Sequence, residues 1–132
     1  MVEADRLATI PFFAALDEEV RASVAQSAFE VEAAVGEQLT VEGDFGYALY
    51  AIESGTAEVS ADGRALGSLG PGDVFGEIAV LASGRRTATV VASSPMRLIA
   101  LFKRDAWALE QRDPAAASAL RALVAQRNGL TG

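Results

Sequence analysis

The residues best suited to chemistry lie between positions 72 and 92. Gly76 and Glu77 close a predicted strand, and residues 78–81 can form about one turn of helix. The backbone N–H groups at the start of a helical turn have no partner inside it, so they can bind an anion. Arg86 follows nine residues after Glu77, and a guanidinium pairs well with phosphate. A glycine-initiated turn and a returning arginine therefore predict a compact phosphate site.

Glu77 lies beside this predicted site, where a carboxylate alone would weaken the binding of an anion. A carboxylate is a strong hydrogen-bond acceptor, and a sugar hydroxyl is a suitable donor for it. Phosphate and ribose together indicate a nucleotide as the ligand.

Charge is distributed unevenly along the chain, whose net charge is −7. Residues 1–80 carry 3 basic and 15 acidic side chains, whereas residues 81–132 carry 8 basic and 3 acidic side chains. An acidic protein repels bulk nucleic acid, so we expect no nucleic-acid binding by this chain itself. A small anion needs only one local positive site, which the second part of the chain can provide.

The amino-acid types that are missing exclude several kinds of active site. The chain has no histidine and no cysteine, so it has no thiolate nucleophile, no Ser-His-Asp triad and no usual zinc site. No apolar run approaches the roughly 20 residues that span a bilayer, and no signal peptide is evident. We therefore expect a cytoplasmic protein that is not an enzyme, needs no catalytic cofactor or metal, and does not insert into membranes.

The elements that must position these residues follow the order helix, β-rich middle and helix. Residues 10–28 carry apolar side chains at helical spacing, with Asp17 as a capping residue. Asp62 and Gly63 are typical of a tight hairpin turn. Alternating patterns between frequent breakers predict short strands at 29–35, 38–42, 47–53, 56–61, 64–69, 87–92 and 96–102.

Beyond residue 102 the chain is again predicted to be helical. One amphipathic helix covers residues 105–112, and Pro114 is a natural first residue for the next. The pair Asn128-Gly129 can end that second helix. Trp107 and Leu109 are expected to pack the two helices on the β-rich part.

The expected fold is mainly β with flanking helices, because many short strands with frequent turns indicate a barrel or roll. We expect an antiparallel β-roll, a double-sheet jelly roll, with an N-terminal helix and a C-terminal helical pair. The chain is predicted to be one domain over residues 1–132. Its parts are an N-terminal helical segment (1–28), the roll (29–102) and the C-terminal helices (103–128).

Two sequence motifs resemble those of a known family. Residues 75–81 read Phe-Gly-Glu-Ile-Ala-Val-Leu, and residues 86–90 read Arg-Thr-Ala-Thr-Val. This pattern over residues 75–90 resembles the phosphate-binding cassette of the cyclic nucleotide-binding domains. That family includes bacterial catabolite-activator-type regulators and the regulatory subunits of cyclic-nucleotide-dependent kinases. Upstream residues that match the family's pattern are Gly43-Asp44, Leu49-Tyr50, Ile52 and Gly55.

The resemblance implies how a cyclic phosphate would be bound. Arg86 resembles the arginine that pairs with the exocyclic phosphate oxygens. The backbone amides of Ala79 and Thr87 resemble the donors to the same oxygens. Arg85 falls at a loop position, so we expect it to be exposed and to make no direct contact with the ligand.

The resemblance also implies a ribose site and a link to the helices. Glu77 and the backbone of Gly76 resemble the pair that holds the ribose 2′-hydroxyl. Ile78 would lie in the helix of the cassette, and Val80 would couple the cassette to the C-terminal helices.

The function implied by the resemblance is a sensor that binds cAMP, with cGMP as the alternative. Occupancy would be relayed through the C-terminal helices to a protein partner or a fused effector domain. Two other hypotheses stay open: an interaction scaffold of the same fold with little nucleotide affinity, and the sensor half of a transcription regulator. The hydroxyl of Thr87 could accept a hydrogen bond from the 2-amino group of guanine, a donor that adenine lacks. The sequence does not indicate the oligomeric state.

Overall fold

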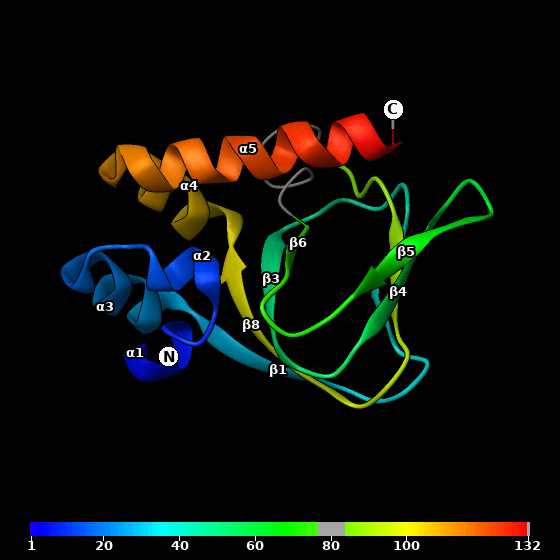
Figure 1. Ribbon diagram of the computed structural model, residues 1–132, viewed down its shortest axis with the longest axis horizontal. Helices are drawn as coiled ribbons and strands as arrows, with labels where there is room; N and C mark the ends of the chain where they lie inside the picture. The colour runs from blue at the N-terminus through cyan, green and yellow to red at the C-terminus, as the bar shows by residue number, and fades with distance from the viewer. Residues whose placement is uncertain (77–83, 132) are drawn as a thin grey trace.

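Two four-stranded antiparallel sheets enclose an apolar core between them. Figure 1 shows how the strands of the two sheets face each other. This computed structural model describes residues 1–76 and 84–131, with side chains described up to residue 122. The first sheet has the order β1 (Phe29–Ala33), β8 (Met96–Phe102), β3 (Ala48–Ser54) and β6 (Val74–Phe75). The second has the order β2 (Gln38–Thr40), β7 (Thr89–Ala92), β4 (Ala57–Ala61) and β5 (Arg64–Leu69). The predicted mainly β roll is confirmed.

Strand β3 separates two apolar cores, because its side chains alternate between the faces of the first sheet. Tyr50 and Ile52 belong to the core between the two sheets. Leu49 and Ala51 belong to the core between the first sheet and the helices. The first sheet is thus covered on both faces, which fixes the position of β3 and of the residues that precede it.

The hairpin between β4 and β5 turns at Asp62 and Gly63, as predicted. Their φ angles are +53° and +74°, and two successive positive φ angles are what the tight hairpin turn requires. The carboxylate of Glu42 accepts a hydrogen bond of 3.1 Å from the N–H of Asp62 and so holds the turn against the segment that follows β2.

Three short helices precede the roll, where the sequence predicted one helical segment. They are α1 (Ala4–Leu7), α2 (Pro11–Ala14) and α3 (Glu18–Ser27). Arg21 explains the break before α3, because its Nη1 donates to the carbonyls of Leu16 (2.8 Å) and Ala14 (3.3 Å) and satisfies the end of α2. Asp17 is at the N-cap position of α3 as predicted, although its side chain makes no capping hydrogen bond.

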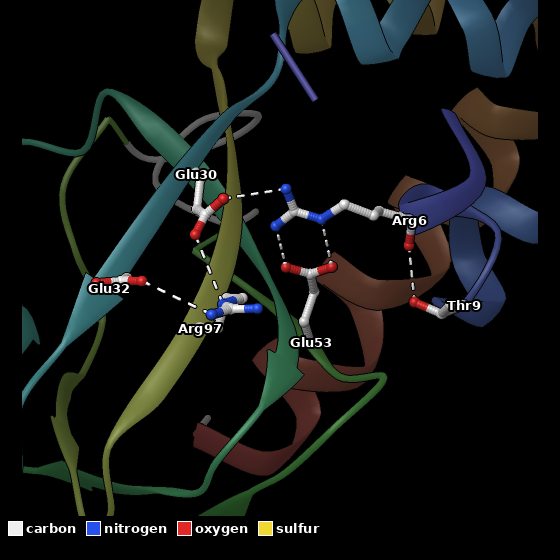
Figure 2. Close-up of polar contacts among 6 residues, drawn as sticks. All are labelled: Arg6, Thr9, Glu30, Glu32, Glu53 and Arg97. Carbon is white, nitrogen blue, oxygen red and sulfur yellow. Dashed lines mark hydrogen bonds and ion pairs between the residues drawn. The ribbon is translucent and has the colours of Figure 1, made fainter. Parts of the chain in front are cut away.

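Arg6 ties α1 to the first sheet through carboxylates, as Figure 2 shows. Its guanidinium donates two hydrogen bonds to Glu53 of β3, one of them from Nε at 3.0 Å, and another of 3.0 Å to Glu30 of β1. Glu30 also lies 3.5 Å from Nε of Arg97 on β8. The hydrogen bond with Glu53 raises the pKa of Arg6, against the opposite effect of burial. This network joins a terminal helix to three neighbouring strands.

Two helices, α4 (Lys103–Arg112) and α5 (Pro114–Thr131), follow β8. Asp113 caps α5, since its Oδ1 accepts hydrogen bonds from the N–H groups of Ala115 (2.9 Å) and Ala116 (3.2 Å). The prediction that the second helix ends at Asn128-Gly129 is wrong, because α5 continues to Thr131. A glycine inside a helix costs only about 1 kcal/mol relative to alanine, which the rest of a helix can outweigh.

The prediction that Trp107 packs the helices on the roll is also wrong. Ala106 and Leu109 form the buried face of α4, as Leu109 was expected to do, whereas Trp107 is 44% exposed. Successive helical residues are rotated by about 100°, so the indole next to Ala106 turns toward the surface. Within the described part of the chain, no helix has the length and apolar character needed to cross a membrane.

Candidate functional site

Arg86 lies just before β7, and its side chain enters the roll instead of pointing to solvent. The residue is only 8% exposed. Its Nη2 donates a 2.8 Å hydrogen bond to the carbonyl oxygen of Ala48, at the start of β3. Its Nη1 donates a 3.2 Å hydrogen bond to the carbonyl oxygen of Gly76, directly after β6. These two contacts fix the direction in which the guanidinium points.

The backbone of Arg86 is held as firmly as its side chain. Its N–H donates to the carbonyl of Asp44 at 2.7 Å, and its carbonyl accepts from the N–H of Gly43 at 2.9 Å. The N–H of Gly46 donates to the carbonyl of Gly84 at 3.0 Å, so the pairing continues along both segments. The Gly43-Asp44 pair of the sequence motif therefore has a visible purpose, which is to anchor the residue that carries the guanidinium.

Gly76 must be a glycine for two independent reasons. Its φ is +86°, a conformation that residues with a Cβ rarely adopt. A Cβ at this position would also lie 2.5 Å from Nη1 of Arg86 and 3.2 Å from the carbonyl oxygen of Ala48. The sequence analysis predicted a role only for the backbone of Gly76. The structure adds that the absence of a side chain at Gly76 leaves space for the guanidinium of Arg86.

Tyr50 is a residue at this site to which the sequence analysis gave no role. Its ring stacks on Phe75, with ring centroids 5.2 Å apart and planes inclined by 25°. Cζ of Arg86 lies 5.6 Å from the centroid of the Tyr50 ring. The alternation of β3 contained a usable signal, since Tyr50 and Ile52 are two residues apart and must face the same side.

Arg85 has a different environment, as expected from its loop position. Arg85 is exposed. Its Cζ lies 4.2 Å from the ring centroid of Phe45, which is itself 58% exposed. Its Nη1 donates a 2.9 Å hydrogen bond to the carbonyl of Gly43. The guanidinium of Arg85 is therefore stacked on an aromatic ring at the surface of the molecule.

The structure brings together part of the predicted site. Gly76 and Arg86 are in contact, and the half-buried Thr87 follows Arg86 in the chain. The other predicted site residues, Glu77, Ile78 and Ala79, lie outside the described residues, as does Val80. Among the residues that are described, no group of three or more histidine, cysteine or acidic side chains is arranged to hold a metal ion. The described geometry is suited to binding an anion with one oriented guanidinium.

A family model described as cyclic nucleotide-binding domain matches residues 30–113. The chain is 40% identical over 97 residues to the cyclic AMP receptor protein of Thermus thermophilus, covering 70% of this chain and 45% of that protein. It is 44% identical over 89 residues to a cAMP-dependent protein kinase regulatory subunit of Yarrowia lipolytica, covering 67% of this chain and 24% of that protein. The chain thus spans less than half the length of either relative.

A comparison with solved structures also finds a protein of similar fold. The catabolite activator protein of Thermus thermophilus matches with a TM-score of 0.77 and 36% sequence identity, over 89% of this chain and 57% of that chain. The residues matched by the family model extend from β1 to the end of α4 and include Gly76 and Arg86. This chain belongs to the cyclic nucleotide-binding domain family.

Proposed function

We propose that this protein is a sensor that binds cAMP non-covalently and catalyses no reaction on it. The observation that carries the proposal is the setting of Arg86, which is 8% exposed and held by the carbonyls of Ala48 and Gly76. Charge-assisted hydrogen bonds are strong and directional, and they strengthen where water is excluded. A buried guanidinium that points in one direction is therefore suited to the cyclic phosphate.

The remaining contacts with the ligand follow from the family pattern. In this proposal Arg86 binds the exocyclic phosphate oxygens together with the backbone amides of Ala79 and Thr87. Glu77 and the backbone of Gly76 bind the ribose 2′-hydroxyl. Ile78 belongs to the same binding segment, which covers residues 75–90. Exchange of Glu77 for glutamine, with 2′-deoxy-cAMP as the second ligand, separates the ribose contact from the phosphate contact.

The preference for cAMP is supported by the two relatives that are named for it, the cyclic AMP receptor protein and the cAMP-dependent kinase subunit. The alternative ligand is cGMP, because a hydroxyl at position 87 could accept a hydrogen bond from the guanine 2-amino group. A neutral hydrogen bond is worth only about 0.5–1.5 kcal/mol, so Thr87 alone does not determine which base is preferred.

The proposed output is a movement of the C-terminal helices toward a protein partner or a fused effector domain. The segment that anchors the backbone of Arg86 continues to Tyr47, whose carbonyl accepts a 2.8 Å hydrogen bond from the N–H of Lys103 in α4. Nζ of Lys103 lies 5.3 Å from the ring centroid of Tyr47 and 5.5 Å from that of Trp107. A shift of residues 43–47 on binding would therefore move the start of α4. The cytoplasmic location expected from the sequence is part of the same proposal.

Thermal unfolding with and without nucleotide tests the binding function. A ligand at 100 times its dissociation constant should stabilise the folded protein by about 2.7 kcal/mol. We expect cAMP to raise the melting temperature, and calorimetry to give a one-site binding curve. If neither cAMP nor cGMP changes the melting temperature at millimolar concentration, the sensor proposal is wrong and the scaffold alternative replaces it.

The relay is tested separately, with the protein saturated with cAMP. Trp107 is the only tryptophan of the chain, so its fluorescence reports on α4 alone. We expect a change in this fluorescence on binding, together with altered hydrogen exchange in α4. Binding without either change would leave a nucleotide-binding protein that has no relay through α4.

A further inference from the structure

We propose that Tyr50 is the positioning residue for Arg86, an inference that rests on the proposed function. The face of its ring lies beside the guanidinium, with Cζ of Arg86 5.6 Å from the ring centroid. This ring face sets the direction of the N–H donors of Arg86 that would bind the cyclic phosphate. Tyr50 itself makes no contact with the ligand in this proposal.

The ring of Tyr50 has a fixed position because β3 is paired with a strand on each side at Tyr50. Tyr50 is opposite Ala100 of β8 and opposite Phe75 of β6. Its ring also stacks on the ring of Phe75, which is only 1% exposed. Both the backbone and the ring of Tyr50 are therefore fixed by neighbouring strands of the first sheet.

The ring of Tyr50 adds a contact of a different kind to the two hydrogen bonds that the guanidinium of Arg86 donates to backbone carbonyls. The carbonyls of Ala48 and Gly76 hold Nη2 and Nη1, which fixes two points of the planar group. An aromatic face beside the plane favours one orientation of the guanidinium, since cations are attracted to the ring face. Tyr50 supplies that face from the same side of β3 as Ala48.

The neighbouring arginine provides a matched control within the same molecule. Arg85 also lies over an aromatic ring, that of Phe45, at 4.2 Å. Phe45 is 58% exposed and makes an isolated bridge with Arg85 instead of lying in a strand. Removing the ring of Phe45 therefore alters a cation–aromatic contact of the same kind without touching Arg86.

Calorimetric titration with cAMP is the first test. Tyr50→Leu is expected to weaken binding about threefold to thirtyfold, the range that a cation–aromatic contact is worth. Tyr50→Phe keeps the ring and should bind within about twofold of the natural protein, as should Phe45→Leu. In an Arg86→Ala background, Tyr50→Leu should cause no further loss. Full affinity in Tyr50→Leu, or equal losses in the Leu and Phe variants, would overturn the proposal.

A second measurement needs no nucleotide and keeps the two proposals distinguishable. NMR relaxation gives the order parameter of the Arg86 Nε–H bond vector, which is measured in the natural protein, in Tyr50→Leu and in Phe45→Leu. We expect the Nε–H bond vector of Arg86 to be rigid in the natural protein and in Phe45→Leu, and measurably more mobile in Tyr50→Leu. A mobile Arg86 in the natural protein, or a rigid one in Tyr50→Leu, would overturn the positioning role even if cAMP binds. If the NMR result is as expected but calorimetry detects no cAMP binding, the positioning of Arg86 by Tyr50 is supported and the proposed function is refuted. Should Tyr50→Leu fail to fold, Tyr50→Met replaces it.

Discussion

Arg85 and Arg86 are adjacent in the chain, and each lies over an aromatic ring, yet their environments are opposite. Arg85 is exposed on Phe45, whereas Arg86 is 8% exposed and bonded to the carbonyls of Ala48 and Gly76. The difference arises because the two side chains leave an extended segment on opposite sides. An arginine in a binding motif is therefore identified by what surrounds it, and the residue type alone does not distinguish the two.

The largest expected effect comes from removing the buried guanidinium. Arg86→Ala should weaken cAMP binding by about 2–5 kcal/mol, as for other buried charge pairs, whereas Arg85→Ala should change it by less than about 1 kcal/mol. Calorimetry on both variants measures the two losses. Equal losses would mean that the comparison between the two arginines is mistaken.

The next effect tests whether the space around Arg86 matters. Gly76→Ala adds a methyl group that would lie 2.5 Å from Nη1 of Arg86, so we expect the affinity for cAMP to fall roughly tenfold or more. Gly36→Ala is the control, since Gly36 has the same φ of +86° and nothing within 4 Å of its Cβ position. Both variants should lose about 1–3 kcal/mol of stability through backbone strain. Normal cAMP affinity in Gly76→Ala would show that Arg86 is not confined as described.

A third arginine sharpens the comparison, because its partners are carboxylates. Arg6 joins α1 to Glu53 and Glu30, and all three residues lie outside the binding segment of residues 75–90 (Figure 2). Arg6→Ala should lower the free energy of unfolding by about 1 kcal/mol and leave cAMP affinity unchanged. Arg97→Ala, whose side chain is 55% exposed, should cost less. Chemical denaturation gives the stabilities, and a loss of nucleotide affinity in Arg6→Ala would contradict this separation.

Thr87, the next residue after Arg86, should give the smallest effect. The substitution Thr87→Ala removes the side-chain hydroxyl. We expect it to weaken cGMP binding by about twofold to tenfold and to leave cAMP binding nearly unchanged, because only guanine carries the 2-amino donor. Competition titrations with both nucleotides measure this difference. Equal weakening of both would assign the hydroxyl of Thr87 to the phosphate.

The sequence predicted the roll well because strand patterns are local. Alternation placed Val31 and Ala33 on one face of β1, and Asp62 with Gly63 could only form a tight turn. Arg86 and Gly76 were identified from their spacing, and the structure brings them into contact.

Other features depend on contacts between distant residues, which local patterns do not contain. The break between α2 and α3 depends on the hydrogen bonds of Arg21. The exposure of Trp107 depends on which face of α4 meets the other helices. The place of Tyr50 beside Arg86 depends on the pairing of β3 with the short strand β6. In each case the missing information is the packing of one element on another.

The central claim is that Arg86, and not its neighbour, binds the phosphate of a cyclic nucleotide. The most direct test is an NMR titration with cAMP that follows the side-chain Nε–H signals of Arg85 and Arg86 together. The account predicts that the Arg86 signal shifts and saturates with the calorimetric affinity, while the Arg85 signal stays in place. A saturating shift of Arg85 alone, or no shift of either signal at millimolar cAMP, would contradict it.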